Sequence, residues 1–369
     1  MLITGIELER LRLPLDPPFF AAWDPDPRRV FDATIVRVRT DEGLTGIGSG
    51  DTMSGFGDFE HLFVGREALE LSVHGRTLET IAFHAGRFWP LEAALWDLAG
   101  KALGAPVATL LGAAVKRLPA YASLGELRTA EQRAQDAHAL VAAGFHAVKV
   151  RIARDRLDEG IAVVAAMRDA VGDALEIMVD LNQWWRMAGD ISAPLDLAAV
   201  RRIAAELHDL GVLWLEEPLP GADLDGMRTL REQTGIRVAG GEMARTQAEL
   251  LDALAAGALD VVQPDVVLAV GMLRARTVAE IAQARNHWFT PHTWTNGLGL
   301  LANLHVAAGV GGGPYLEFPY DPPGWTEQRR DFFLSRPVLI DAGGYLAVPA
   351  APGLGAEIDE VAVARWALR

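Results

Sequence analysis

Three short apolar runs decide the fold: VLWLEEP at 212–218, IRVAGGE at 236–242 and DVVQPD at 260–265. Each run has the length and composition of a buried strand, and each carries an acidic residue at or directly before its end. Amphipathic helical segments separate the runs, and two of these segments end at Gly235 and Gly257. Short strands that alternate with helices in this way predict a parallel sheet with right-handed crossovers.

The same alternation continues on both sides of these runs. Eight strands are expected, at residues 118–123, 146–152, 176–182, 212–218, 236–242, 260–265, 287–292 and 315–318. Eight strands with seven intervening segments in roughly 200 residues suit a closed βα barrel better than an open sheet. The sequence therefore predicts an α/β protein with a barrel at residues 118–331.

The sequence before this barrel has another pattern. Strands expected at 3–13, 34–39 and 44–48 precede helices, an order typical of an α+β unit. A Pro-rich loop is expected at 14–27, between the first two strands. In one of the helices, leucines 91, 95 and 98 share a face, and Gly104 ends the helix.

Three parts of the chain are expected: residues 1–117, 118–331 and 332–369. The last part holds an extended stretch at 337–348 and a Pro/Gly-rich end. We expect this tail to pack back on the first part.

Composition excludes several classes of protein. The chain has 369 residues with 34 Lys+Arg against 49 Asp+Glu, a net charge of −15, so neither nucleic acid nor an anionic membrane is an expected partner. Cysteine is absent, which excludes disulfides, thiolate metal sites and cysteine nucleophiles. The sequence has no signal-peptide pattern and no apolar run of about 18 residues, so a cytoplasmic location is expected.

Ionisable residues stand at the ends of seven consecutive expected strands. A single one would usually be a helix cap or a solvated charge. In a parallel barrel, however, the C-terminal strand ends converge on one mouth, where barrel enzymes hold their chemistry. The residues concerned are Lys149, Arg151, Asp180, Glu216, Glu242, Asp265, His292 and Glu317.

Three of these acids lie on adjacent strands: Asp180, Glu216 and Glu242. Converging carboxylates repel one another and raise one another's pKa unless a cation holds them. All-oxygen ligation favours Mg²⁺, with Mn²⁺ as an alternative, and argues against Zn²⁺. A divalent metal site is therefore predicted at the barrel mouth.

The remaining groups are suited to binding an acid and moving a proton. Lys149 and Arg151 are two residues apart on a strand, so they share a face and can meet an anionic substrate. Asp265 and His292 end neighbouring strands, where a carboxylate can orient the imidazole and raise its basicity.

This order of motifs resembles the enolase superfamily, specifically its mandelate racemase-like group (the mandelate racemase/muconate lactonizing enzyme family). The resemblance covers essentially the whole chain. It implies a (β/α)7β modified TIM barrel with an N-terminal α+β capping domain that the C-terminal segment completes. The motifs that carry it are Lys-x-Arg at 149–151, Asp-x-Asn at 180–182, Glu-Glu-Pro at 216–218, Gly-Gly-Glu at 240–242, Gln-Pro-Asp at 263–265, Pro-His-Thr-Trp at 291–294 and the late Glu317.

The resemblance also implies roles for individual residues. One Mg²⁺ per subunit would be bound by Asp180, Glu216 and Glu242. The catalytic set would be Lys149 and Arg151 beside the substrate carboxylate, the Asp265–His292 acid/base dyad, and Glu317 at that carboxylate. The substrate contacts would be Asn182, Trp23, Ser54 and Trp294. The shared step is removal of the proton α to a carboxylate to give a metal-stabilised enediolate. A homo-oligomer is expected.

One departure from the family pattern bears on the reaction. Arg151 stands where the family's racemases have a second lysine, and a guanidinium is a poor proton acceptor. A single base that removes the α-proton and then helps to expel a β-hydroxyl gives a dehydration. The sequence therefore favours a lyase, an acid-sugar dehydratase forming a 2-keto-3-deoxy product. A racemase, epimerase or cycloisomerase of a carboxylate is the alternative.

A second departure is the length of one unit. Asp180 and Glu216 are 36 residues apart, whereas Glu216 and Glu242 are 26 apart. The extra residues, at 183–196, include Trp184 and Trp185. They can be a solvated insertion with two packed tryptophans or a rim that walls the pocket.

Overall fold

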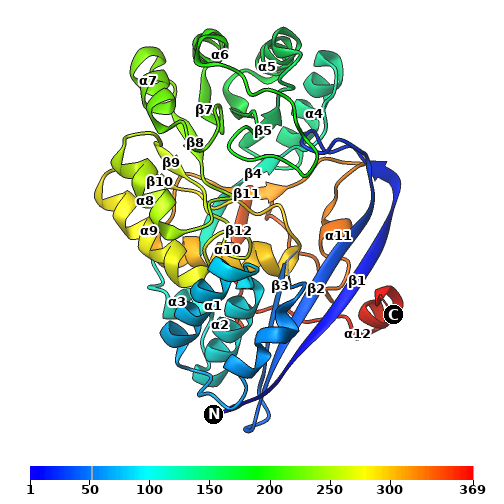
Figure 1. Ribbon diagram of the computed structural model, residues 1–369. Helices are drawn as coiled ribbons and strands as arrows, with labels where there is room; N and C mark the ends of the chain where they lie inside the picture. The colour runs from blue at the N-terminus through cyan, green and yellow to red at the C-terminus, as the bar shows by residue number, and fades with distance from the viewer. Residues whose placement is uncertain (51–52, 369) are drawn as a thin grey trace.

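A three-stranded antiparallel sheet opens the chain in the computed structural model, which describes residues 1–50 and 53–368. Its strands are β1 (Ile3–Phe19), β2 (Arg28–Thr40) and β3 (Thr45–Gly50), and β1 and β2 run as a long ribbon along one side of the molecule (Figure 1). The loop predicted at 14–27 is therefore wrong for its first six residues, which extend β1. Pro17 and Pro18 fall where the register with β2 shifts, between Pro14 and Phe19. At such an irregularity the ladder does not need the backbone N–H that a proline lacks.

A 3-10 helix, η1 (Phe56–Leu62), and three helices, α1 (Leu71–His84), α2 (Trp89–Leu103) and α3 (Val107–Leu110), follow this sheet. The predicted leucine face of α2 is buried, and Gly104 ends the helix in a left-handed conformation with φ 64°. Helix α2 lies close against β3, because a Cβ atom on Gly46 or Gly48 would collide with carbonyl oxygens of α2.

The rest of the chain builds the parallel sheet, in the order β10-β9-β8-β7-β6-β5-β4-β11. The strands are β4 (Arg117–Ser123), β5 (Ala147–Arg151), β6 (Glu176–Asp180), β7 (Val212–Glu216), β8 (Val238–Gly240), β9 (Val261–Val262), β10 (Trp288–Phe289) and β11 (Leu316–Pro319). The connecting helices are α4 (Ala130–Ala142), α5 (Leu157–Val171), α6 (Leu197–Asp209), α7 (Leu224–Thr234), α8 (Gln247–Ala255), α9 (Met272–Ala284) and α10 (Gly297–Val310). The predicted α/β fold class, eight parallel strands with seven connecting helices, is confirmed.

Strands β8 to β10 are shorter than predicted. Their predicted ends fall in irregular backbone, because Gly241 takes a positive φ of 109° and Pro264 and Pro291 lack the N–H that a ladder needs. No ladder joins β10 to β11 among the described residues, but the Gly313 amide, just before β11, donates to the Phe289 carbonyl of β10 at 2.6 Å.

Large and small side chains together fill the barrel interior. Tyr121, Met178 and Trp214 pack there with Ala147, Ala239 and Val261. Side chains alternate between the two faces of a strand, so residues two positions further along the same strands also point inward. This layer is the floor beneath the charged residues at the strand ends.

Hydrogen bonds join the N-terminal part to the barrel. The Trp89 indole donates to the Ala269 carbonyl at 2.8 Å, and the Glu92 carboxylate accepts from the Met272 amide at 2.8 Å, at the start of α9. Asp97 accepts from the amides of Ile47 and Leu354, at 2.8 and 2.7 Å. These contacts hold the N-terminal helices, the barrel and the tail in one arrangement.

The tail contacts both parts of the molecule. A short helix, α11 (Glu327–Arg330), follows β11; strand β12 (Tyr345–Ala347) then pairs antiparallel with β4, and helix α12 (Glu360–Trp366) lies beside β1 (Figure 1). The Leu368 amide donates to the Arg10 carbonyl at 2.8 Å. The expected division into 1–117, 118–331 and 332–369 stays a prediction. No helix in the described residues is long and apolar enough to cross a bilayer.

His305 on α10 makes the stability of this fold depend on pH. Its Nδ1 accepts from the Ala108 amide at 3.0 Å and its Nε2 donates to the Leu354 carbonyl at 3.1 Å, and burial lowers its pKa from 6.5 to about 4. Between pH 4 and pH 6.5, His305 is protonated in the unfolded chain and neutral in the folded chain. The stabilisation from His305 is therefore complete above pH 6.5 and is lost as the pH falls through 4.

The difference in the free energy of unfolding between the wild type and His305→Gln isolates this contribution. We expect that difference to be about 3 kcal/mol smaller at pH 4 than at pH 7. Denaturant unfolding at a series of pH values measures it. The matched control is His138→Gln on the exposed face of α4, which should track the wild type. Parallel curves for the wild type and His305→Gln would contradict the assignment.

Candidate active site

Three carboxylates meet at the mouth of the barrel. Asp180 ends β6 directly opposite Glu216 at the end of β7, and Glu242 follows β8. One oxygen from each of the three lies within 4.8 Å of the others, and all three residues are buried. Glu242 Oε2 is buried and, among the described atoms, has no hydrogen-bond partner. The sequence prediction that these acids converge is confirmed, and the cluster can hold a cation.

Two basic side chains from β5 lie against these acids. Lys149 pairs with Glu216, with Glu317 at 2.8 Å and with Asp180 at 3.5 Å. Arg151 pairs with Asp180, and its guanidinium lies 4.9 Å from the centre of the Trp23 ring. The Lys149 ammonium is thus engaged by three carboxylates.

Negative charge is nevertheless in excess. Six buried carboxyl groups surround the two cations: Asp180, Glu216, Glu217, Glu242, Asp265 and Glu317. Burial raises the pKa of Glu242, and both burial and the neighbouring Glu242 and Glu216 raise that of Glu217 well above its usual range. Both Glu217 oxygens lack a hydrogen-bond partner within the described structure. An all-oxygen, over-negative cluster of this kind fits a hard divalent ion such as Mg²⁺.

The imidazole beside this cluster is oriented by a carboxylate. His292 Nδ1 lies 2.9 Å from Asp265 Oδ2, and Asp265 Oδ1 accepts from the Val267 amide at 2.8 Å. Asp265 therefore holds the proton on Nδ1, and Nε2 faces Glu242 Oε2 at 3.6 Å. Burial lowers the pKa of His292, but the charges of Glu242, Glu317 and Asp265 outweigh it and raise the pKa to about 9.

Glu317 connects the charged cluster to the aromatic side of the site. It accepts from Ser123 Oγ at 2.7 Å and from the Thr293 amide at 2.8 Å. Burial raises its pKa, but Lys149, His292 and Arg151 outweigh this and lower the pKa to about 2. Glu317 is therefore an ionised acceptor at neutral pH.

Trp294 and Trp23 form that aromatic side. The Trp294 indole donates to Ser123 Oγ at 2.7 Å, and the two tryptophan rings meet edge to face with centres 4.8 Å apart. Trp23 comes from the N-terminal part of the chain, so both parts contribute to the site.

The other two expected substrate contacts differ in position. Asn182 donates to Asp180 through its backbone N–H at 2.7 Å and through its side-chain amide at 3.2 Å. Ser54 is exposed, and within the described structure no hydrogen bond joins it to the cluster. Its role stays a prediction.

The first residues of the insertion at 183–196 form a wall of the site, whereas most of residues 188–196 are exposed to solvent. The Trp185 indole donates to Glu242 Oε1 at 2.8 Å. Gln183 fixes the base of the loop by donating to the Pro218 carbonyl at 2.5 Å and accepting from the Leu195 amide at 2.7 Å. Trp184 lies against Gly221, where a Cβ atom would collide with its ring.

Several of these hydrogen bonds to the carboxylates were not predicted from the sequence. Besides Trp185 and Ser123, Gln263 and Trp214 donate to Glu216 Oε2, at 2.9 and 3.1 Å. None of the four is ionisable, so a pattern of charged strand ends does not mark them. Gln263 lies in the Gln-Pro-Asp motif and Trp185 in the unusually long unit, so those two carried a signal.

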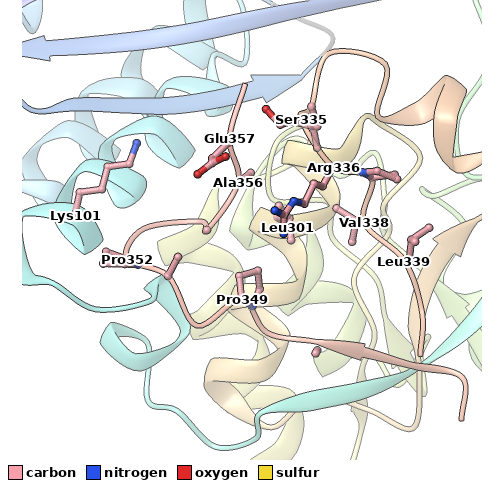
Figure 2. A pocket seen from close by; sticks show the side chains of 15 residues that line it. Lys101, Leu301, Ser335, Arg336, Val338, Leu339, Pro349, Pro352, Ala356 and Glu357 are labelled. Atoms are coloured by element: carbon pink, nitrogen blue, oxygen red, sulfur yellow. The ribbon is translucent and has the colours of Figure 1, made fainter. Parts of the chain in front are cut away.

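The structure has a cavity of about 690 Å³ that lies away from the cluster. It lies between the tail and helices α2 and α10, as Lys101, Leu301 and Pro349 show in Figure 2. A small cavity of about 50 Å³ borders the site at Trp23, Arg151, Asn182 and Trp185.

Trp185 should matter for metal binding, because its N–H fixes the Glu242 carboxylate with Oε2 toward the other two acids. We expect Trp185→Phe to weaken Mg²⁺ binding on the order of 10- to 100-fold, measured by titration calorimetry. Trp184→Phe, the same change at the neighbouring position, is the control and should bind Mg²⁺ like the wild type. Unchanged affinity in Trp185→Phe would show that the hydrogen bond is incidental.

Comparison with known proteins agrees with this geometry. The Enolase C-terminal domain-like family matches residues 132–362. The chain is 30% identical over 273 residues to an arabinonate dehydratase of Saccharolobus solfataricus, covering 73% of this chain and 69% of the relative. It is 30% identical over 284 residues to a D-galactarolactone cycloisomerase of Agrobacterium fabrum, covering 75% and 72%.

Among solved structures, a racemase from Streptomyces coelicolor A3(2) with bound magnesium superposes with a TM-score of 0.84 at 26% identity, and each chain is fully covered. The resemblance read from the motifs is confirmed. The chain belongs to the enolase superfamily, as a member of the Enolase C-terminal domain-like family.

Proposed function

We propose that this protein is a Mg²⁺-dependent lyase that dehydrates an acid sugar to a 2-keto-3-deoxy acid and water. The observation that carries the proposal is the asymmetry of its basic groups. One imidazole is oriented by Asp265, whereas Arg151 is held between Asp180 and Trp23 and Lys149 is engaged by three carboxylates. His292 is thus the one group placed to exchange a proton with the substrate, and a single acid/base group suits elimination better than two-base racemisation.

The proposed metal ligands are Asp180, Glu216 and Glu242. When bound there, Mg²⁺ supplies electrostatic stabilisation of the charge that develops on the substrate carboxylate. The Lys149 ammonium lies beside the carboxylate on the protein side. Glu317, ionised and fixed by Ser123 and Thr293, holds Lys149 in place and offers an acceptor to the substrate.

His292 carries the proton in this scheme. Its Nε2 removes the proton from the carbon α to the carboxylate, and the electrons of that C–H bond become the enediolate. The same electrons then form the α,β double bond as the β C–O bond breaks, and the imidazolium returns its proton to the departing hydroxyl as water. The enol product tautomerises to the 2-keto acid, so atoms and charge balance with one acid/base residue.

A racemase, epimerase or cycloisomerase is the second candidate, favoured by the 30% identity to a cycloisomerase. All these reactions begin with the same proton removal, and they differ in whether water is lost.

Turnover of a panel of aldonic and aldaric acids with Mg²⁺ separates the candidates. We expect a 2-keto-3-deoxy product, detected as its semicarbazone, from at least one acid. Deuterium incorporation from D₂O at the α-carbon of some acid, with no keto product from any of them, would replace the dehydratase by the isomerase.

His292→Asn tests the base. We expect dehydration to fall by about 10²- to 10⁴-fold, because asparagine cannot accept the proton, while calorimetry still shows Mg²⁺ binding. His138→Asn on exposed α4 is the matched control and should keep full turnover. Turnover retained in His292→Asn would reassign the base to Lys149.

A further inference from the structure

A second cavity lies beside the proposed metal ligands. It measures about 580 Å³ and adjoins the cluster through Trp185, which donates to Glu242, and through Met243, which follows Glu242 in the chain. Its other walls come from the 183–196 insertion, the segments after β7 and β8, and the connection between α1 and α2. Both parts of the molecule therefore line it.

Three arginines from three segments line this cavity. Arg87 precedes α2, Arg186 belongs to the insertion, and Arg245 follows β8. Such a gathering of guanidinium groups is unexpected in a chain of net charge −15. Guanidinium groups are the side chains best suited to bidentate binding of carboxylate or phosphate.

Two acids line the cavity within the described part of the chain. Glu249 is occupied at the start of α8, where it accepts from the Arg245 amide at 3.0 Å and from Thr246 Oγ1 at 3.4 Å. Asp252 is the other. Among the described lining residues, arginines therefore outnumber acids, and Glu249 is already a hydrogen-bond acceptor for the protein itself.

Arg186 is only loosely paired within the protein. Its nearest carboxylate is Asp190 at 3.9 Å, and that group is already paired with Arg154 at 2.6 Å. Burial and the charge of Arg154 lower the pKa of Arg186. About a quarter of the Arg186 side chain is exposed, and it lines the cavity, so its guanidinium can pair with an incoming anion.

The cavity also reaches toward the reacting end of the site. The small cavity that borders Trp23, Arg151 and Asn182 shares two wall residues with it, Trp185 and Arg186. Arg186 therefore lies in the wall between the two cavities, on the side of the site away from the β10 and β11 residues.

Resting on the proposed function, we propose that Arg186, together with Arg87 and Arg245, binds a second anionic group at the far end of the substrate. The preferred substrate is then a sugar acid with two anionic ends, either a diacid or a phosphate-terminated acid. This separates it from the aldonic acids, which end in a neutral hydroxymethyl group.

Matched sets of hexose-derived acids test this proposal. Each set has one stereochemistry and three termini: the aldonate, the aldarate and the 6-phosphoaldonate. Binding is measured by calorimetry with Mg²⁺ present, and turnover is measured separately. In at least one set, we expect an acid with two anionic ends to bind about tenfold or more tightly than its aldonate, and the tighter of the two identifies the terminus.

Arg186→Gln should reduce that preference to less than about threefold, with the change in KM and not in kcat. Arg245→Gln, at an exposed position, is the second variant should Arg186→Gln fail to fold, and it should reduce the preference in the same direction. Arg285→Gln, an exposed arginine at the C-terminal end of α9, is the matched control and should leave the preference intact.

Equal binding of aldonates and two-ended acids, or a preference that survives both variants, overturns the inference even if dehydration is observed. An arginine-dependent preference without any keto product supports the subsite and counts against the dehydratase.

Discussion

Repulsion among buried carboxylates at the barrel mouth is the constraint on which the rest of the structure depends. Six acids lie in a region that burial removes from water, and Lys149 and Arg151 offset only part of their charge. Uncompensated charge of this kind would destabilise the fold if it were left alone. A divalent ion bound by Asp180, Glu216 and Glu242 would neutralise this charge. The excess negative charge that destabilises the fold is therefore also what binds the catalytic metal.

Neutral donors complete this arrangement. Trp214 and Gln263 both donate to Glu216, and Trp185 donates to Glu242, so these two ligands are oriented by groups that add no charge. The Trp214 ring also belongs to the barrel floor. The Trp214 side chain therefore both packs the core and orients a proposed metal ligand.

Much of the site could be predicted from sequence because a βα barrel brings every C-terminal strand end to one rim. The charged residues at those ends, from Lys149 to Glu317, needed only the strand order to be placed together. Strand length was harder: β9 is two residues long because Pro264 interrupts the run that the apolar pattern extends to Asp265. Uncharged partners such as Ser123 were hardest, since a serine has no pattern that distinguishes a donor to Glu317 from any buried hydroxyl.

The pairing of β4 has a consequence for how the chain is made. Strand β11 pairs with residues 120–123 along one edge of β4, and the other edge meets β5 and the tail strand β12. Until β11 leaves the ribosome, its edge of β4 has no partner, although β4 is the first barrel strand to be synthesised. An unpaired strand edge is a template for aggregation, and contacts so distant in sequence form slowly. Completion of the barrel therefore waits for the last barrel strand, and a nascent chain arrested before residue 316 presents an open edge to its neighbours.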